Sequence, residues 1–125
     1  MHCPKCTSVM EKVEYQSVEI DRCKSCHGIW FDWLEAEQLK KLKGSEQIDT
    51  GSPEQGKIYN KIGKIECPKC HTQMGKMVDN HQPHIWYEYC DICFGIFLDA
   101  GEFRDYKEDN ILDLFKDLFY SKPRQ

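Results

Sequence analysis

The chain has 125 residues, 30% of them charged, and a formal net charge of −4. Proteins that hold nucleic acid mainly through its phosphates usually have a basic face, so this acidic balance disfavours nucleic acid as the main ligand. No run approaches the roughly 18 apolar residues that span a bilayer. The start, Met1-His2-Cys3, lacks the pattern of a secretion signal, and we therefore expect a cytoplasmic protein.

The eight cysteines form four Cys-x-x-Cys pairs with none left over. Sixteen residues separate the first pair from the second, and nineteen separate the third from the fourth. Both spacings fall in the range typical of zinc sites, and thiols in a reducing compartment stay free to bind metal. The predicted ligands are Cys3, Cys6, Cys23 and Cys26 for the first site, and Cys67, Cys70, Cys90 and Cys93 for the second.

Four thiolates suit one tetrahedral Zn²⁺, so the sequence predicts two zinc ions per chain. A site with four protein ligands leaves no position for a metal-bound water, and we expect no enzyme activity. Iron in a rubredoxin-like centre and thiol redox chemistry remain alternatives, because both also use paired cysteines.

The first unit reads as a zinc ribbon followed by a helix. Alternating apolar residues predict two short strands that turn near residues 16–17, and a third strand at 29–31. A helix is expected from Asp32 to Gly44. Asp32 and Glu35 stand at the spacing of a capping box, which makes helix capping a better reading of Glu35 than general acid catalysis.

The second unit repeats this pattern, with Asp99 and Glu102 in place of the capping pair. We divide the chain into ribbon 1 with its helix (1–44), a linker (45–64), ribbon 2 with the start of its helix (65–108), and a C-terminal amphipathic helix (109–125). The linker is expected to be flexible over about residues 45–56, where glycine, serine and proline interrupt every pattern. The predicted fold class is therefore a small metal-stabilised α+β fold: two zinc ribbons of short antiparallel strands, each followed by a helix.

Two features distinguish the second unit from the first. Its turn, around residues 79–83, is three residues longer, and His81 and His84 sit in this longer turn. Beyond Asn110, residues 111–120 read I-L-D-L-F-K-D-L-F-Y, an apolar helix face wider than a helix resting on one small ribbon requires. This face either packs on the ribbons or contacts a protein partner or a second copy.

Other residue types leave two interpretations open. His27 and His71 adjoin ligand cysteines, but with four cysteines per site we expect them outside the ligand set. Trp30, Trp33 and Trp86 either fill the core of a small sheet or stack on single-stranded bases. For the nucleic-acid alternative, the candidate phosphate contacts are Lys5, Lys12, Arg22 and Lys24.

The repeated motifs resemble the transcription factor IIB-type zinc-ribbon family of bacterial type, which reads C-P-x-C…C-x-x-C-x-G-x-W-x-D-x-x-E. The resemblance covers residues 3–39 and 67–103, with Phe97 at the tryptophan position of the second copy. Thr7 and His71 stand where a knuckle glycine is common. The resemblance implies two ribbons with four cysteine ligands each, and it implies little about activity.

We therefore expect a non-enzymatic zinc-binding protein that acts as a protein-interaction module and is associated with transcription. The expected contact surface for a protein partner or for self-association is the helix over 111–120. Binding of DNA or RNA is the alternative function, and a thiol redox protein is a weaker one. No membrane contact is expected.

Overall fold

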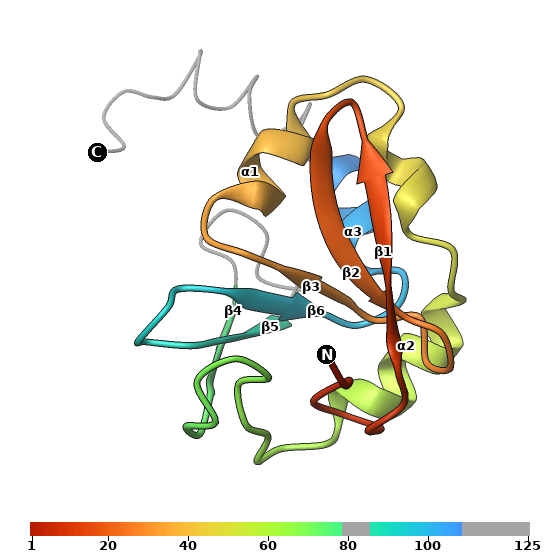
Figure 1. Cartoon of the computed structure of the whole chain (residues 1–125). Helices are drawn as coiled ribbons and strands as arrows, with labels where there is room; N and C mark the ends of the chain where they lie inside the picture. The colour runs from red at the N-terminus through yellow and green to blue at the C-terminus, as the bar shows by residue number, and fades with distance from the viewer. Residues whose placement is uncertain (79–85, 109–125) are drawn as a thin grey trace, which may run out of the picture.

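The computed structural model describes residues 1–78 and 86–108, whose arrangement is shown in Figure 1. The elements in chain order are β1 (Met10–Tyr15), β2 (Val18–Cys23), β3 (Ile29–Phe31), α1 (Glu35–Lys40), the 3-10 helix η1 (Ser45–Ile48), α2 (Pro53–Asn60), β4 (Gly75–Val78), β5 (Trp86–Tyr89), β6 (Ile96–Leu98) and α3 (Glu102–Glu108). The α+β fold class is confirmed. None of the helices in these two ranges is long and apolar enough to cross a membrane.

Each ribbon is an antiparallel hairpin extended by a third strand, as predicted. In the first, Gln16 and Ser17 form the turn with φ angles of 48° and 73°. Positive φ at both central residues is typical of the two-residue turns that match the twist of a hairpin. The hairpin is in register from Met10 opposite Cys23 to Tyr15 opposite Val18, so one cysteine lies at its open end.

The two ribbons join into one six-stranded sheet in the order β1-β2-β3-β6-β5-β4. The central pair, β3 and β6, is antiparallel, and it places Trp30 opposite Phe97 (Figure 1). Because these two residues occupy the same position in the two repeats, the halves of the sheet are related by a pseudo-two-fold axis at this pair. Ile29 accordingly lies opposite Leu98, the equivalent of Phe31.

The sheet buries a separate apolar cluster on each face, because successive side chains of a strand point to opposite sides. One cluster contains Trp30 and Phe97 together with the cysteines of both sites. The other contains Ile29, Phe31 and Leu98 with residues of α1, η1 and α3. Neither cluster belongs to one ribbon alone.

At both helix starts the glutamate makes its predicted capping-box contact, but the aspartate does not cap the helix. Glu35 does reach back, because its Oε1 accepts from the backbone N–H of Asp32 at 2.9 Å. Asp32 does not cap the helix: α1 begins after Leu34, which stands at the N-cap with φ 72° and gives no side-chain cap. The Asp32 carboxylate instead accepts from the indole N–H of Trp30 at 3.0 Å. The helix also ends earlier than predicted, at Lys40.

Residues 45–64 were expected to be a linker, flexible over about 45–56, yet the structure places η1 and α2 in this segment. Ser52 caps α2 by accepting from the N–H of Gln55 at 3.1 Å, and Pro53 occupies the first turn. The segment packs on ribbon 2, where the Asp49 carboxylate accepts from the N–H groups of Gly101 and Arg104 at 2.9 and 3.0 Å. Glycine, serine and proline here act as helix caps and close-contact residues rather than as a flexible tether.

Several predictions fall outside the described residues. They are the long turn at 79–83, the histidines His81 and His84, and the helix over 109–125 with its apolar residues 111–120. The four-part division of the chain also stays a prediction.

Candidate metal centres

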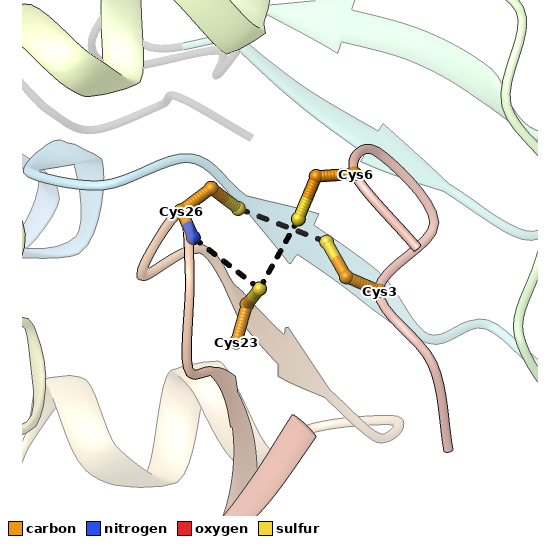
Figure 2. Close-up of side chains that lie close together, drawn as sticks. All are labelled: Cys3, Cys6, Cys23 and Cys26. Atoms are coloured by element: carbon orange, nitrogen blue, oxygen red, sulfur yellow. Dashed lines mark hydrogen bonds between the residues drawn. The ribbon is translucent and has the colours of Figure 1, made fainter. Parts of the chain in front are cut away.

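Cysteine sulfur atoms from two knuckles converge at the open end of the first hairpin. Figure 2 shows the side chains of Cys3, Cys6, Cys23 and Cys26 pointing toward one another. The Sγ atoms of Cys3 and Cys26 are 3.7 Å apart, and those of Cys6 and Cys23 are 3.4 Å apart. All four sulfurs lie within 4.8 Å of one another.

The second cluster repeats the first. Cys67, Cys70, Cys90 and Cys93 also place their sulfurs within 4.8 Å of one another, and those of Cys67 and Cys93 are 3.7 Å apart. The structure thus brings all eight cysteines predicted as ligands into two groups of four, paired as the sequence spacing predicts.

The local backbone explains why each knuckle aims its sulfurs inward. In every knuckle the residue after the second cysteine has a left-handed backbone, with φ between 63° and 65°, at Thr7, His27, His71 and Phe94. This turn directs backbone N–H groups at the first sulfur of the pair. Cys23 Sγ, for example, accepts from the N–H groups of Ser25 and Cys26 at 3.3 Å.

One thiol in each cluster is readily deprotonated, as a metal ligand must be. The hydrogen bond with Cys26 lowers the pKa of the Cys3 thiol to about 5. Burial raises the pKa of Cys90, but the N–H groups of Cys93 and Ile92 outweigh it and bring the pKa down to about 6.

The geometry and the donor set fit zinc. With Zn–S bonds of about 2.3 Å, a tetrahedral site separates its sulfurs by about 3.8 Å, close to the separations above. Four thiolates would carry more charge than one Zn²⁺ neutralises, and the N–H groups aimed at the sulfurs offset part of this excess. Each cluster is suited to one ion, giving two per chain, and when bound the metal would supply structural cross-linking.

The two clusters are held together by reciprocal packing across the pseudo-two-fold axis. A methyl group on Gly28 would lie 2.2 Å from Cζ of Phe97, and one on Gly95 would lie 2.2 Å from Cζ2 of Trp30. Each large ring therefore covers the glycine next to the other ribbon's knuckle. Trp30 and Phe97 are both fully buried, which explains why this motif needs a glycine and an aromatic residue two positions apart.

The knuckle lysines also cross between the ribbons. Lys5 Nζ lies 2.8 Å from Glu88 Oε2 and 3.0 Å from Asp99 Oδ2, with its side chain fully buried. Its equivalent, Lys69, lies 2.5 Å from Asp32 Oδ1, with 44% of its side chain exposed. The aspartates predicted to cap helices are thus used to join the ribbons.

Burial raises the pKa values of two carboxyls near Lys5. It raises the pKa of Asp99 to about 6 although the Lys5 ammonium opposes the shift. Burial and the neighbouring charge of Asp99 raise the pKa of Glu102 to about 8. Glu102 still accepts from the Asp99 N–H at 3.2 Å, which supports its predicted structural role.

The remaining candidates divide between core and surface. Trp30 is core, whereas Trp33 and Trp86 are 63% and 42% exposed. His27 Nδ1 lies 3.3 Å from Gln55 Oε1 and is not part of a sulfur cluster. His71 is exposed.

Comparison with protein families decides what this arrangement is. The sequence profile of the TFIIB-type zinc ribbon, described as a transcription factor zinc-finger, matches residues 2–42 and 66–109, which is more than half of the chain. The chain belongs to the TFIIB-type zinc-ribbon family. It is a tandem member, since each match contains one four-cysteine cluster. No curated protein and no solved structure matches it.

Membership in the TFIIB-type zinc-ribbon family agrees with the resemblance carried by the cysteine, glycine and aspartate positions. Zinc ribbons of this family are typically non-catalytic. Sequence reasoning considered Lys5 only as a candidate phosphate contact and did not use the fact that both Cys-Pro-Lys-Cys motifs share this lysine. Its repetition marks the two ion pairs that join the ribbons.

Proposed function

We propose that this tandem zinc ribbon is a non-enzymatic protein-interaction module that acts in transcription. The supporting observation is an exposed apolar patch where the two ribbons meet: the rings of Trp33 and Phe94 are 6.0 Å apart, and these residues are 63% and 56% exposed. Large apolar side chains gathered on a small acidic protein are typical of a surface that contacts another protein. Residues 111–120, whose sequence predicts a wide apolar helix face, are the proposed contact segment for a protein partner or a second copy.

The proposal predicts that Leu114→Asp plus Leu118→Asp abolishes self-association or capture of the partner that the unaltered chain binds. The matched control is Asp113→Ser plus Asp117→Ser, which changes polar positions of the same segment. Sedimentation and affinity capture provide the readouts, and mass spectrometry checks that both metal ions remain bound. Equal binding by the leucine variant and the unaltered chain would refute the proposal.

Nucleic-acid binding is the alternative, and the charge arrangement weakens it. Lys5 is buried in ion pairs, Lys12 pairs with Asp21 at 3.1 Å, and Arg22 pairs with Glu11 at 3.0 Å. These are three of the four predicted phosphate contacts. Fluorescence anisotropy with single- and double-stranded DNA and RNA at two salt concentrations tests it: salt-sensitive binding at micromolar protein would support the alternative.

Thiol redox chemistry is the weaker alternative. All eight cysteines lie in the two four-sulfur clusters, where a bound metal holds the thiolates away from exchange. The metal-free reduced protein should therefore reduce insulin disulfides slowly, and rapid turnover would favour the redox function instead.

A further inference from the structure

The apolar patch continues into a groove beside the start of α1. The groove has a volume of about 190 Å³, and we call it the Trp33 groove. Its apolar walls are formed by Trp33, Leu34, Tyr87, Phe94, Ile96 and Tyr106, with Glu37 among the other lining residues. The rings of Trp33 and Phe94 lie 6.0 Å apart, centroid to centroid. Ribbon 1 and ribbon 2 therefore both contribute to it.

The pseudo-two-fold axis relates this groove to a site on the same face of the sheet, in its other half, that the chain itself covers. There, His27, Ala100 and Gly101 stand in the places of Phe94, Trp33 and Leu34. A methyl group on Gly51 would lie 2.5 Å from Cβ of Ala100 and 2.6 Å from Cβ of His27. The segment that follows ribbon 1 thus packs directly on ribbon 2.

Two residues of that covering segment determine how it is held. Ile48 is 2% exposed and belongs to the buried cluster that contains Ile20 and Ile29, the equivalents of Tyr87 and Ile96 in the groove. The next residue, Asp49, meets the start of α3, and its backbone carbonyl accepts from Arg104 at 2.8 Å. The contact therefore combines one apolar residue inserted beside the strands with one charged residue beside the helix start.

The offset of 67 residues relates the second knuckles within the two family matches, which end at residues 42 and 109. Counted onward by the same offset, Phe115 and Lys116 take the positions of Ile48 and Asp49, and Glu37 takes that of Arg104. By this count an aromatic residue stands where the first repeat has isoleucine. At the groove, Glu37 and Lys116 carry opposite charges, which favours their approach.

Chain length allows the contact within one molecule. Tyr106 lines the groove, and the 17 residues after Glu108 begin only three positions further on. In the covered half, Ile48 and Asp49 stand eight and nine residues after the end of α1. Lys116 stands eight residues beyond Glu108 and can reach the equivalent place.

We propose that residues 109–125 dock in the Trp33 groove of the same chain, with Phe115 inserted between its walls and Lys116 beside Glu37. The docked segment withholds its apolar face, so a partner must displace it. This last regulatory step rests on the proposed interaction function, whereas the docking does not. The conformation of Leu34 supports the docking. Its backbone is in the unfavourable left-handed region, with φ 72°, and this places a side chain that is 47% exposed at the groove wall.

Hydrogen–deuterium exchange of the partner-free, zinc-loaded full chain tests the docking. We expect amides of residues 111–120 to exchange at least about tenfold more slowly than in an unstructured peptide. Trp33→Ala plus Phe94→Ala should remove this protection, as should Phe115→Asp, a change outside the sequence of both ribbons. Trp86→Ala, a change at an exposed tryptophan outside the groove, should preserve it.

Charge reversal supplies a second, independent test. Glu37→Lys and Lys116→Glu should each reduce the protection, and the two together should restore it. Exchange at the unstructured rate in the unaltered chain, or protection unchanged by both groove and Phe115 variants, would overturn the proposal. Protection that grows with protein concentration would also overturn it, by assigning the groove to the tail of a second copy. None of these outcomes depends on capturing a partner, so the docking and the interaction function can fail separately.

Discussion

Lys5 of the first ribbon lies 3.0 Å from Asp99 of the second, and neither side chain is more than 1% exposed. The same ammonium donates to the backbone carbonyl of Tyr59 at 2.8 Å. Lys5 thus connects the first metal knuckle, the end of α2 and ribbon 2. Its equivalent, Lys69, makes the corresponding ion pair to Asp32 on the surface.

Lys5→Met should reduce the free energy of unfolding by about 3–5 kcal/mol, because it leaves Glu88 and Asp99 buried without their cation. Lys69→Met is the matched control and should cost less than about 1 kcal/mol, since water screens an exposed pair. Urea unfolding of the zinc-loaded protein measures both. Similar costs for the two variants would mean that the buried pair does not join the ribbons.

Gly28→Ala and Gly95→Ala should each destabilise the protein by about 1–3 kcal/mol, because the new methyl group would overlap the ring of Phe97 or Trp30. Gly63→Ala is the control, since nothing lies within 4 Å of the position of its methyl group. Thermal unfolding of the three variants checks this. Unchanged stability of the first two would argue against close packing across the axis.

Loss of one metal should weaken the other. Cys6→Ser removes one ligand of the first cluster, and we expect zinc affinity at the second to fall at least about tenfold, because both clusters share the core around Trp30 and Phe97. Chelator competition followed by native mass spectrometry measures the remaining site. Full affinity at the second cluster would show instead that the ribbons fold independently.

Glu102→Gln should stabilise the protein increasingly as the pH rises from 6 to 8.5. The pKa of Glu102 is about 8 in the folded state against an ordinary 4.5. The folded chain therefore binds this proton more tightly, and the unaltered protein loses the corresponding stability as pH rises through 8. Asp99 and Glu88 disfavour the Glu102 carboxylate and Lys5 favours it.

The measurement is the difference in unfolding free energy between this variant and the unaltered chain at both pH values. Metal binding affects the two proteins equally and cancels. A difference that stays constant between pH 6 and 8.5 would contradict the raised pKa.

Leu34→Gly should stabilise the zinc-loaded protein by about 0.5–1 kcal/mol. A left-handed backbone costs a non-glycine residue about 1–2 kcal/mol, and the greater freedom of glycine in the unfolded chain offsets part of this gain. The reverse change, Gly101→Leu, should be strongly destabilising, because even a methyl group there would lie 3.0 Å from Cα of Pro53. Calorimetry of both variants tests whether Leu34→Gly stabilises the protein and Gly101→Leu destabilises it. Destabilisation by Leu34→Gly would refute this prediction.

Local patterns were sufficient to predict the hairpins, the third strands and the grouping of the cysteines, because knuckle spacing and strand alternation act over short distances. They could not predict that β3 pairs with β6, since both strands are short apolar runs whose partners the alternation does not specify. The capping prediction was half wrong for the same reason. Asp32 has the right spacing for a cap, but its carboxylate is bound by Trp30 and Lys69.

The segment over 45–56 shows a further limit of pattern reading. Glycine and proline there indicated a break in structure, yet Gly51 and Gly56 are the residues that allow the backbone to approach Ala100. Only the position of ribbon 2 shows why a small residue is needed at each point.

The pairing of Trp30 with its own equivalent has a consequence for shorter relatives. An isologous dimer interface has this arrangement, in which one patch meets a second copy of itself. A protein with only one such ribbon would leave the edge of its third strand unpaired, and it should form homodimers through that strand at sufficient concentration. In this chain the covalent connection replaces mass action, so both metal centres remain joined at any dilution.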